Sequence, residues 1–296
     1  MIDFHVHLWR KKDTPPEMST YFQNRGMRAE EIISAPALLR SMDRSGIERS
    51  VILSNALTNG LGNAYFHGLN AYVQQQVISC PKRLSAFCTV DPYDPEGALK
   101  ELRLCIEREN FIGLKLHPNV QRFLPQMEKC FPIYEQMQDY GLPVLFHTGG
   151  IGIAPFEDHF GMPEHIDEIA CRFPNMKIIM GHCGRGAYQQ AACVLRKHKH
   201  VYADISANFS KMHGKENMLL KELIQKVKLW TGSTDKLFFG SDYPYYGQLQ
   251  TRYLLESVLD ENGEIPITKE DLDKISCRNA SSFLDEIQSI HDRISV

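Results

Sequence analysis

Five side chains that can bind a metal ion follow short apolar runs in this chain of 296 residues. Imidazole nitrogen and carboxylate oxygen suit a divalent cation such as zinc. Each run is followed by glycine, proline or a polar loop, as where a β-strand ends. If the strands are parallel neighbours, the five side chains meet at the carboxyl end of a barrel, where the chemistry of such barrels lies. They are His5, His7, His147, His182 and Asp242.

The spacing of His5 and His7 favours a shared ion. Residues two apart on a strand point the same way, with Cα atoms roughly 6.5 Å apart. Either histidine alone, or a single histidine or aspartate at a strand end, is often only hydrogen-bonded. Taken together, we predict that His5, His7, His147 and Asp242 bind the metal. His182 is either a further ligand or an acid/base group, and we favour the second, with His182 and Asp242 as catalytic residues.

A lysine in the segment GLKLHP is the next unusual feature. Lys115 and His117 share a face of their predicted strand, and an unpaired buried ammonium is costly. Lys115 could bind an anionic substrate group, pair with a carboxylate, become carbamylated and bridge two metal ions, or extend toward solvent. We predict that Lys115, His117 and Arg185 bind substrate. Arg185 and the tyrosines at positions 243, 245 and 246 lie just past strand ends, so they are candidates to line the pocket.

The elements that must position these side chains alternate between strand-like and helix-like patterns along the chain. We predict an α/β fold with a single (β/α)8 TIM-barrel domain over residues 1–296. A doubly wound open sheet is the alternative, but polar groups follow nearly every strand, whereas an open sheet gathers them at one switch point. The predicted strands are Ile2–His5, Ser50–Ser54, Leu84–Val90, Gly113–His117, Pro143–His147, Lys177–Gly181, Val201–Ile205 and Leu237–Ser241.

Helix ends can be read at several points, from capping residues, prolines and glycines. The segments 10–26 and 149–161 follow the first and fifth strands, and loops in this position often act as lids. The predicted helix starts are Asp94–Pro95, Pro163 and the pair Thr268 and Asp271, and the predicted C-terminal caps are Gly46 and Gly141.

Composition narrows the class of protein. A net charge of −3, with 43% hydrophobic and 23% charged residues, predicts a globular protein with no nucleic-acid partner. The basic run 196–200 is interpreted as a solvated helix end. No segment reaches the ~18 apolar residues of a membrane span, and the N-terminus does not resemble a signal peptide. Eight cysteines without a C-x-x-C pair predict free thiols. We expect a cytoplasmic protein with a small, anionic substrate. The sequence does not decide between a monomer and a homo-oligomer.

Five segments together resemble one family. They are the initial H-x-H, F-H-T-G, G-H-x-G, G-S-D-Y-P, and R-N-A-x-x-F-L at Arg278–Leu284. This pattern resembles the amidohydrolase-related branch of the amidohydrolase superfamily, which includes aminocarboxymuconate-semialdehyde decarboxylase and similar metal-dependent enzymes. The resemblance covers essentially the whole chain, and the branch contains both hydrolases and decarboxylases.

The resemblance implies a metal site and leaves its metal count open. It implies that His5, His7, His147 and Asp242 hold one divalent ion, commonly zinc, and that His182 is catalytic. GLKLHP departs from the decarboxylase pattern and looks more like binuclear relatives such as urease. In a binuclear site, His147 and His182 would both bind a second ion, bridged through a carbamylated Lys115.

Two reactions fit these residues. In the first, metal-dependent hydrolysis, a metal-activated water attacks a small polar amide, ester or lactone. Asp242 takes the proton and passes it to the leaving group, while His182 polarises the carbonyl. The alternative is non-oxidative decarboxylation of a small unsaturated or aromatic acid by a carboxy-lyase. A barrel without activity that binds a ligand is the third hypothesis.

Overall fold

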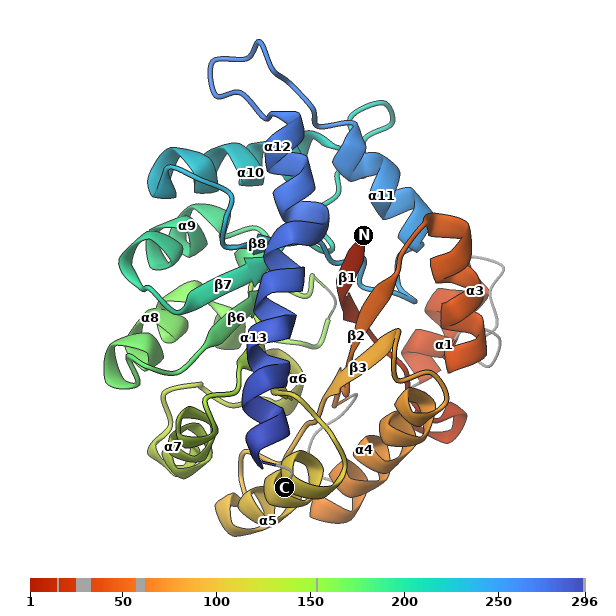
Figure 1. Cartoon of the computed structure of the whole chain (residues 1–296), viewed down its shortest axis with the longest axis vertical. Coiled ribbons are helices and arrows are strands. Elements are labelled where there is room, and N and C mark those ends of the chain that lie inside the picture. The colour runs from red at the N-terminus through yellow and green to blue at the C-terminus, as the bar shows by residue number, and fades with distance from the viewer. Residues whose placement is uncertain (15, 25–32, 57–61, 153, 295–296) are drawn as a thin grey trace.

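The computed structural model describes residues 1–14, 16–24, 33–56, 62–152 and 154–294. Within these residues, eight strands alternate with helices (Figure 1). All strand pairs are parallel, and they form two sheets in the orders β1-β2-β3 and β4-β5-β6-β7-β8. The strands are β1 (Ile2–Val6), β2 (Arg49–Leu53), β3 (Leu84–Phe87), β4 (Leu114–Leu116), β5 (Val144–His147), β6 (Ile178–Gly181), β7 (Val201–Asp204) and β8 (Leu237–Phe238).

Short contacts join the two sheets into a closed barrel. Val6 pairs with Tyr243 beyond β8, and Cys88 beyond β3 pairs with Leu114 on β4, both in parallel register. The backbone N–H of Phe4 also donates to the carbonyl of Phe239 at 2.8 Å. The (β/α)8 barrel predicted from the sequence is therefore confirmed, and the doubly wound open sheet is wrong.

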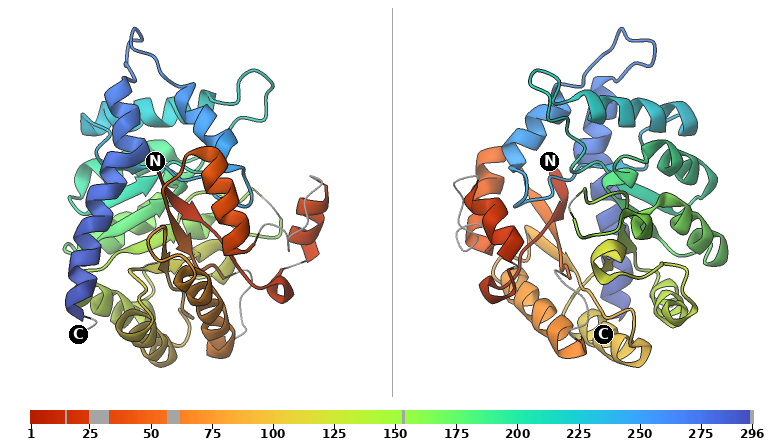
Figure 2. Two further views of the ribbon diagram at one scale, coloured as in Figure 1. Left: turned by 45° about the vertical axis from the view of Figure 1, so that its right-hand side comes forward. Right: turned by 180° about the vertical axis from the view of Figure 1, so that it is seen from behind.

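The helices lie around the strands (Figure 2), and their ends follow the predicted signals. Asp94 accepts a hydrogen bond from the Gly97 N–H at 3.1 Å at the start of α5. Gly46 and Gly141 have the left-handed φ values of +65° and +69° that end a helix. The longer helices are α1 (Pro16–Gln23), α3 (Ala35–Ser45), α4 (Gly62–Ile78), α5 (Pro95–Arg108), α7 (Phe131–Tyr140), α8 (Pro163–Arg172), α9 (Tyr188–Lys197), α10 (Met218–Thr231), α11 (Gln248–Glu256) and α13 (Asn279–Ile294), and the short ones are α6 (Pro118–Gln121) and α12 (Lys269–Asp273).

The structure differs from the sequence prediction at the ends of β3 and β8 and in the last helix. Strand β8 ends at Phe238, three residues before the predicted Ser241. Strand β3 ends at Phe87, three residues before the predicted Val90. The side chain of Asn70 on α4 pairs with both the N–H and the carbonyl of Thr89, each at 2.9 Å, so a side chain replaces the next strand partner. Thr268 and Asp271 form the predicted capping box, but α12 passes through a π-helical turn at 274–278 before α13 begins.

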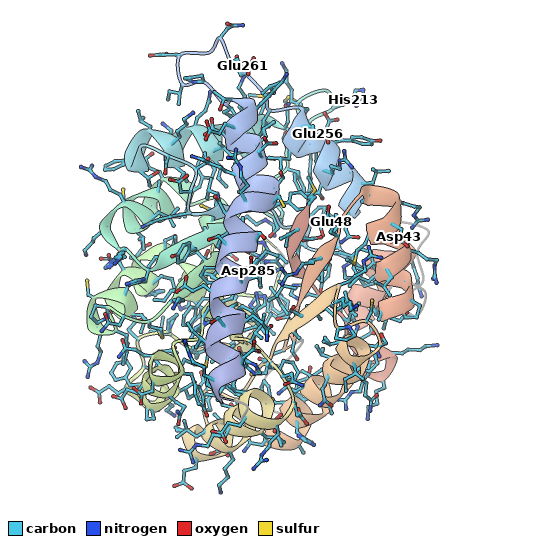
Figure 3. All side chains as sticks on the ribbon, viewed as in Figure 1. Asp43, Glu48, His213, Glu256, Glu261 and Asp285 are labelled. Carbon is cyan, nitrogen blue, oxygen red and sulfur yellow. The ribbon has the colours of Figure 1, made fainter. Side chains whose placement is uncertain are left out.

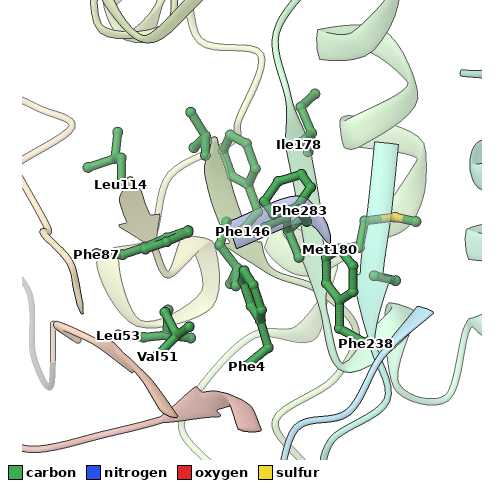
Figure 4. Packing of buried hydrophobic residues seen from close by; sticks show 14 of the residues in the cluster. Phe4, Val51, Leu53, Phe87, Leu114, Phe146, Ile178, Met180, Phe238 and Phe283 are labelled. Carbon is green, nitrogen blue, oxygen red and sulfur yellow. The ribbon is translucent and has the colours of Figure 1, made fainter. Parts of the chain in front are cut away.

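Aromatic side chains fill the core between the strands and α13 (Figure 4). Phe4 on β1 stacks on Phe238 of β8, with ring centroids 4.8 Å apart. Phe283 on α13 packs edge-on against Phe4 at 5.9 Å, and α13 runs across the barrel in Figure 1. The final helix therefore holds the first and last strands together through buried aromatic rings.

The outer surface carries charges of both signs (Figure 3). Exposed Asp43 pairs with Arg83 at 2.6 Å, and exposed Asp285 pairs with Arg49 at 3.5 Å. Pairs of this kind contribute about 0–1 kcal/mol each. Among the described residues, the structure contains no helix with the length and apolarity that a membrane crossing requires.

Candidate active site

The first and last strands bring three of the expected metal ligands together. The Nε2 atoms of His5 and His7 are 3.1 Å apart. Asp242 Oδ1 lies 3.3 Å from His7 Nε2 and 3.8 Å from His5 Nε2. The N–H of Asp242 donates to the carbonyl of His5 at 2.8 Å, which fixes this register. All three side chains are buried at the barrel mouth, the end where the carboxyl ends of the strands meet.

Two further histidines complete the cluster. Ligand atoms of His5, His182 and Asp242 all lie within 4.8 Å of one another. His147 joins the cluster through His182, because His147 Nδ1 lies 3.1 Å from His182 Nε2. The ring of His117 stacks on that of His147, with centroids 4.0 Å apart. Strand ends β1, β5, β6 and β8 thus supply the side chains as the sequence predicted.

Asp204, at the end of β7, was missed in the sequence and links two of these histidines. Its Oδ2 lies 2.7 Å from His5 Nδ1, and its Oδ1 accepts hydrogen bonds from the Ser206 hydroxyl and from the N–H of His182. The Ser206 hydroxyl in turn lies 2.7 Å from His182 Nδ1. An aspartate inside an otherwise apolar strand was the available signal, since aspartate is depleted in strands.

The partners of the ring nitrogens determine which nitrogen carries a proton. His5 Nδ1 faces a carboxylate and His7 Nδ1 faces the Leu53 carbonyl at 2.9 Å, and both partners only accept. In the tautomer that these partners select, Nδ1 is therefore the donor and Nε2 presents a lone pair. Two lone pairs and a carboxylate oxygen of Asp242 then face one another within 3.8 Å. Three acceptors this close repel unless a cation lies between them, so the donor set fits a divalent metal.

Hydrogen-bond partners also fix the protons on His182 and His147. The hydroxyl proton of Ser206 goes to Asp204, so Ser206 accepts from His182 Nδ1. His182 Nε2 is then the acceptor of the His147 Nδ1 proton. The remaining atom, His147 Nε2, is buried and has no hydrogen-bond partner among the described residues. A free lone pair of this kind is what a metal ligand presents.

Burial keeps four of the histidine rings neutral. It is the largest cause that lowers the pKa of these rings well below the usual range, and the positive charge of Lys115 lowers each of them further. Neutral imidazole is the form that binds a metal. The four affected rings are His5, His117, His147 and His182.

Lys115 is fully buried at the barrel mouth. Its ammonium has no hydrogen-bond partner among the described residues. Burial lowers its pKa to about 8, although the carboxylates of Asp204 and Asp242 act in the opposite direction. An unpaired ammonium in this environment favours an anionic partner.

Aromatic rings and one arginine form the rim of the mouth. Tyr245 lies edge-on to His7 at 6.1 Å and stacks with Trp9 at 6.0 Å and with Phe22 of α1 at 5.8 Å. The described part of the predicted lid 10–26 therefore contacts the site; positions 15, 25 and 26 lie outside the described residues. Half-buried Arg185 is close enough for its charge to lower the pKa of His147 and of His182.

A family model described as Amidohydrolase matches residues 2–285. The chain belongs to the amidohydrolase family. This amidohydrolase is 24% identical over 179 residues to a gamma-resorcylate decarboxylase of Polaromonas sp. strain JS666. That alignment covers 50% of this chain and 55% of the relative. It is also 24% identical over 214 residues to a 2-amino-3-carboxymuconate-6-semialdehyde decarboxylase of Dictyostelium discoideum. That alignment covers 64% of this chain and 59% of the relative. The matches thus span less than two thirds of either relative.

Solved structures share the fold of this amidohydrolase. An uncharacterised TIM-barrel protein of Bordetella bronchiseptica has a TM-score of 0.76 at 19% identity, over 97% of this chain and 99% of that one. A 2,6-dihydroxybenzoate decarboxylase from Rhizobium has a TM-score of 0.69 at 16% identity, over 96% and 98%. A dihydroxybenzoic acid decarboxylase from Polaromonas sp. JS666, with bound manganese and 2-nitroresorcinol, has a TM-score of 0.69 at 18% identity, over 98% and 96%. The metal in that structure is manganese, so zinc stays a prediction for this chain.

Proposed function

We propose that this amidohydrolase is a metal-dependent, non-oxidative decarboxylase of a small aromatic or unsaturated carboxylic acid. Hydrolysis was the first expectation from the sequence, but both curated relatives are decarboxylases by name, which favours the alternative. The observation that carries the proposal is the buried, unpaired ammonium of Lys115 beside the metal-binding cluster. A carboxylate substrate supplies the anion that this ammonium lacks.

The rim supports a flat substrate. The rings of Trp9, Phe22 and Tyr245 lie within 22–24° of parallel, next to His7. Such a set offers apolar faces against which an aromatic acid can pack. Arg185 and His117 are proposed to hold the remaining polar groups of the substrate.

The metal would be held by His5, His7, His147 and Asp242, each of which presents a free lone pair or carboxylate oxygen. A bound divalent cation supplies Lewis-acid polarisation of substrate oxygens. We favour one ion; the binuclear arrangement through Lys115 remains the alternative, and manganese and zinc both suit these ligands.

The residues move two protons. Lys115 holds the carboxylate. A neighbouring substrate hydroxyl displaces the His147 Nδ1–H from His182 Nε2, and His182 then accepts the hydroxyl proton and later returns it. Asp242 takes a proton from solvent and adds it to the carbon that bears the carboxylate, which returns Asp242 to the carboxylate form. The bond from that carbon to the carboxyl carbon then breaks, its electron pair returns to the substrate, and CO2 leaves. Proton transfer of this kind typically accelerates a reaction by about 10²–10⁴-fold.

The reaction can be tested with isotopes. The manganese-loaded protein is incubated in D2O with a panel of hydroxybenzoates and unsaturated acids, and in H2¹⁸O with amides, esters and lactones. Decarboxylation releases CO2 and places one deuterium on the carbon that lost it. Hydrolysis instead places ¹⁸O in the product acid. Turnover of an amide, ester or lactone without any CO2 from the acids would reject the proposal.

Asp242→Asn tests the proton path. Turnover should fall by at least about 100-fold, while circular dichroism stays as in the wild type. Metal content must be measured in the same sample, because Asp242 is also a proposed ligand. Activity close to that of the wild type in the metal-loaded variant would contradict the path.

A further inference from the structure

A second group of metal-binding side chains lies between α8 and α9, on the outside of the barrel. Asp167 and Cys171 are four residues apart on α8, so they lie on one face, one turn apart. His198 directly follows the last residue of α9. One ligand atom from each of the three lies within 4.8 Å of the other two.

The position of His198 is fixed independently of the other two residues. Its N–H donates to the Val194 carbonyl at 3.1 Å, and its carbonyl accepts from the Lys236 ammonium at 2.5 Å. Its side chain is only 13% exposed. Cys171 is exposed, so solvent reaches the cluster from the side of α8 and can supply a water ligand.

We propose that Asp167, Cys171 and His198 form a second metal site for zinc or a similar borderline dication, with water as the fourth ligand. Thiolate, imidazole and carboxylate are the three donor types that zinc accepts. A tetrahedral zinc ion separates bound nitrogen and oxygen by about 3.3 Å. His198 Nε2 and Asp167 Oδ1 are hydrogen-bonded at 2.7 Å, so the metal must replace the shared proton while the two atoms separate only slightly.

Lys197 opposes this ion. Its ammonium lies 2.8 Å from Asp167 Oδ2, and its side chain is 54% exposed. The ammonium interacts with one oxygen of Asp167 and with the Cys171 side chain, and it repels a dication. Because Lys197 can turn into solvent, it weakens metal binding without excluding it, and the site binds more weakly than the barrel mouth.

The two sites lie at opposite ends of the barrel. His198 precedes the start of β7 at Val201, whereas the mouth lies beyond the carboxyl ends of the strands. A metal between α8 and α9 therefore binds without contact to the residues of the mouth. Two ions per chain would then not imply a binuclear active site.

Cobalt distinguishes the sites, because a thiolate bound to Co²⁺ gives an intense near-ultraviolet charge-transfer band. The mouth ligands proposed above include no thiol. Co²⁺ is titrated into the manganese-loaded protein, and the band should appear in the wild type and disappear in Cys171→Ser. Cys193→Ser removes a partly exposed thiol on the neighbouring helix α9 and is the matched control, which should retain the band. Absence of the band from the wild type, or its persistence in Cys171→Ser, overturns the proposal.

Lys197→Gln gives an independent readout. Loss of the competing ion pair should tighten Co²⁺ binding about fivefold, and the band should saturate at lower cobalt concentration. His198→Ala should weaken binding by about tenfold or more. Unchanged cobalt affinity in both variants would assign the band to another thiol and reject the site.

Discussion

At the residue scale, one carboxylate sets the proton positions of three histidines in the cluster. Asp204 binds His5 directly and His182 through Ser206, and His182 in turn accepts a proton from His147. Asp204 thereby leaves a free Nε2 lone pair on His5 and on His147, whereas the Leu53 carbonyl does the same for His7. Partners of this kind orient ligands and raise their basicity.

Asp204→Asn should therefore weaken metal binding by about 10–100-fold, because an amide can donate to His5 and reverse its tautomer. Titration calorimetry with Mn²⁺ measures the change. Ser206→Ala is the control, since it keeps the contact to His5 and should lower turnover more than metal affinity. Equal metal affinity in Asp204→Asn and the wild type would show that Asp204 does not control the ligand.

Lys115 lowers the stability of the free protein, and its proposed role is to bind the substrate carboxylate. Its pKa is lowered from 10.5 to about 8 by burial, so its charged form destabilises the fold. That penalty is complete below pH 8 and disappears as the pH rises toward 10.5. Without substrate, Lys115→Met should raise the free energy of unfolding by up to about 3 kcal/mol at pH 7, at 1.36 kcal/mol per pKa unit.

Urea unfolding of Lys115→Met at pH 7 and pH 9.5 measures this effect, and the gain should shrink at the higher pH. The same variant should lose substrate binding, seen as a higher KM. A destabilised Lys115→Met, or a gain that grows with pH, would show that the ammonium is stabilised in the fold.

Sequence located the mouth residues well because each ends a strand. His5, His147, His182 and Asp242 follow apolar runs, and parallel strands must bring such positions together. Asp204 was missed because the predicted strand ran on to Ile205, so Asp204 was placed inside the strand and not at its end. Its role depends on a hydrogen bond to a residue 199 positions away, which no local pattern encodes.

At the element scale, close backbone approach between β1 and β8 positions His5. A Cβ added at Gly240 would lie 2.8 Å from His5 Cβ and 3.1 Å from Asp204 Oδ1. Gly240→Ala must therefore displace the histidine or the chain after β8. At Gly247 the nearest atom to an added Cβ is Gln250 Cβ at 4.0 Å, which is ordinary contact.

Gly240→Ala should lower metal affinity and cost about 1–3 kcal/mol of stability. Gly247→Ala should change neither quantity measurably. Metal content and thermal unfolding of the two variants, compared with the wild type, check the prediction. Full metal loading in Gly240→Ala would show that β1 and β8 can separate without harm to the site.

The sequence predicted all eight strands but not their lengths. Near-continuous apolar runs indicate buried parallel strands. Such runs do not show where backbone pairing with the neighbouring strand stops. At β3, pairing stops because Asn70 replaces the partner strand at Thr89. The contact between the segment after β1 and Tyr245 was likewise inaccessible, because stacking between distant rings leaves no periodicity in the sequence.

At the scale of the whole molecule, the proposed metal joins the first strand to the last. His5 and His7 belong to β1 and its continuation, and Asp242 follows β8. The ion therefore bridges the junction where β1 of one sheet meets β8 of the other, which we call a seam. Backbone bonds also hold this seam, with His7 N–H donating to the Tyr243 carbonyl at 2.7 Å. The other seam, between β3 and β4, has no proposed ligand from either strand.

Metal removal should therefore loosen one seam selectively. A metal at 100 times its Kd adds about 2.7 kcal/mol to the stability of any state that binds it. Chelation should then raise amide hydrogen exchange by up to about 100-fold in segments 2–8 and 239–246. Hydrogen-exchange mass spectrometry with and without EDTA measures this, with segment 84–90 at the β3–β4 seam as the internal control. An equal rise at both seams would mean that the ion stabilises the barrel as a whole, and no rise at either would mean that it does not bridge β1 and β8.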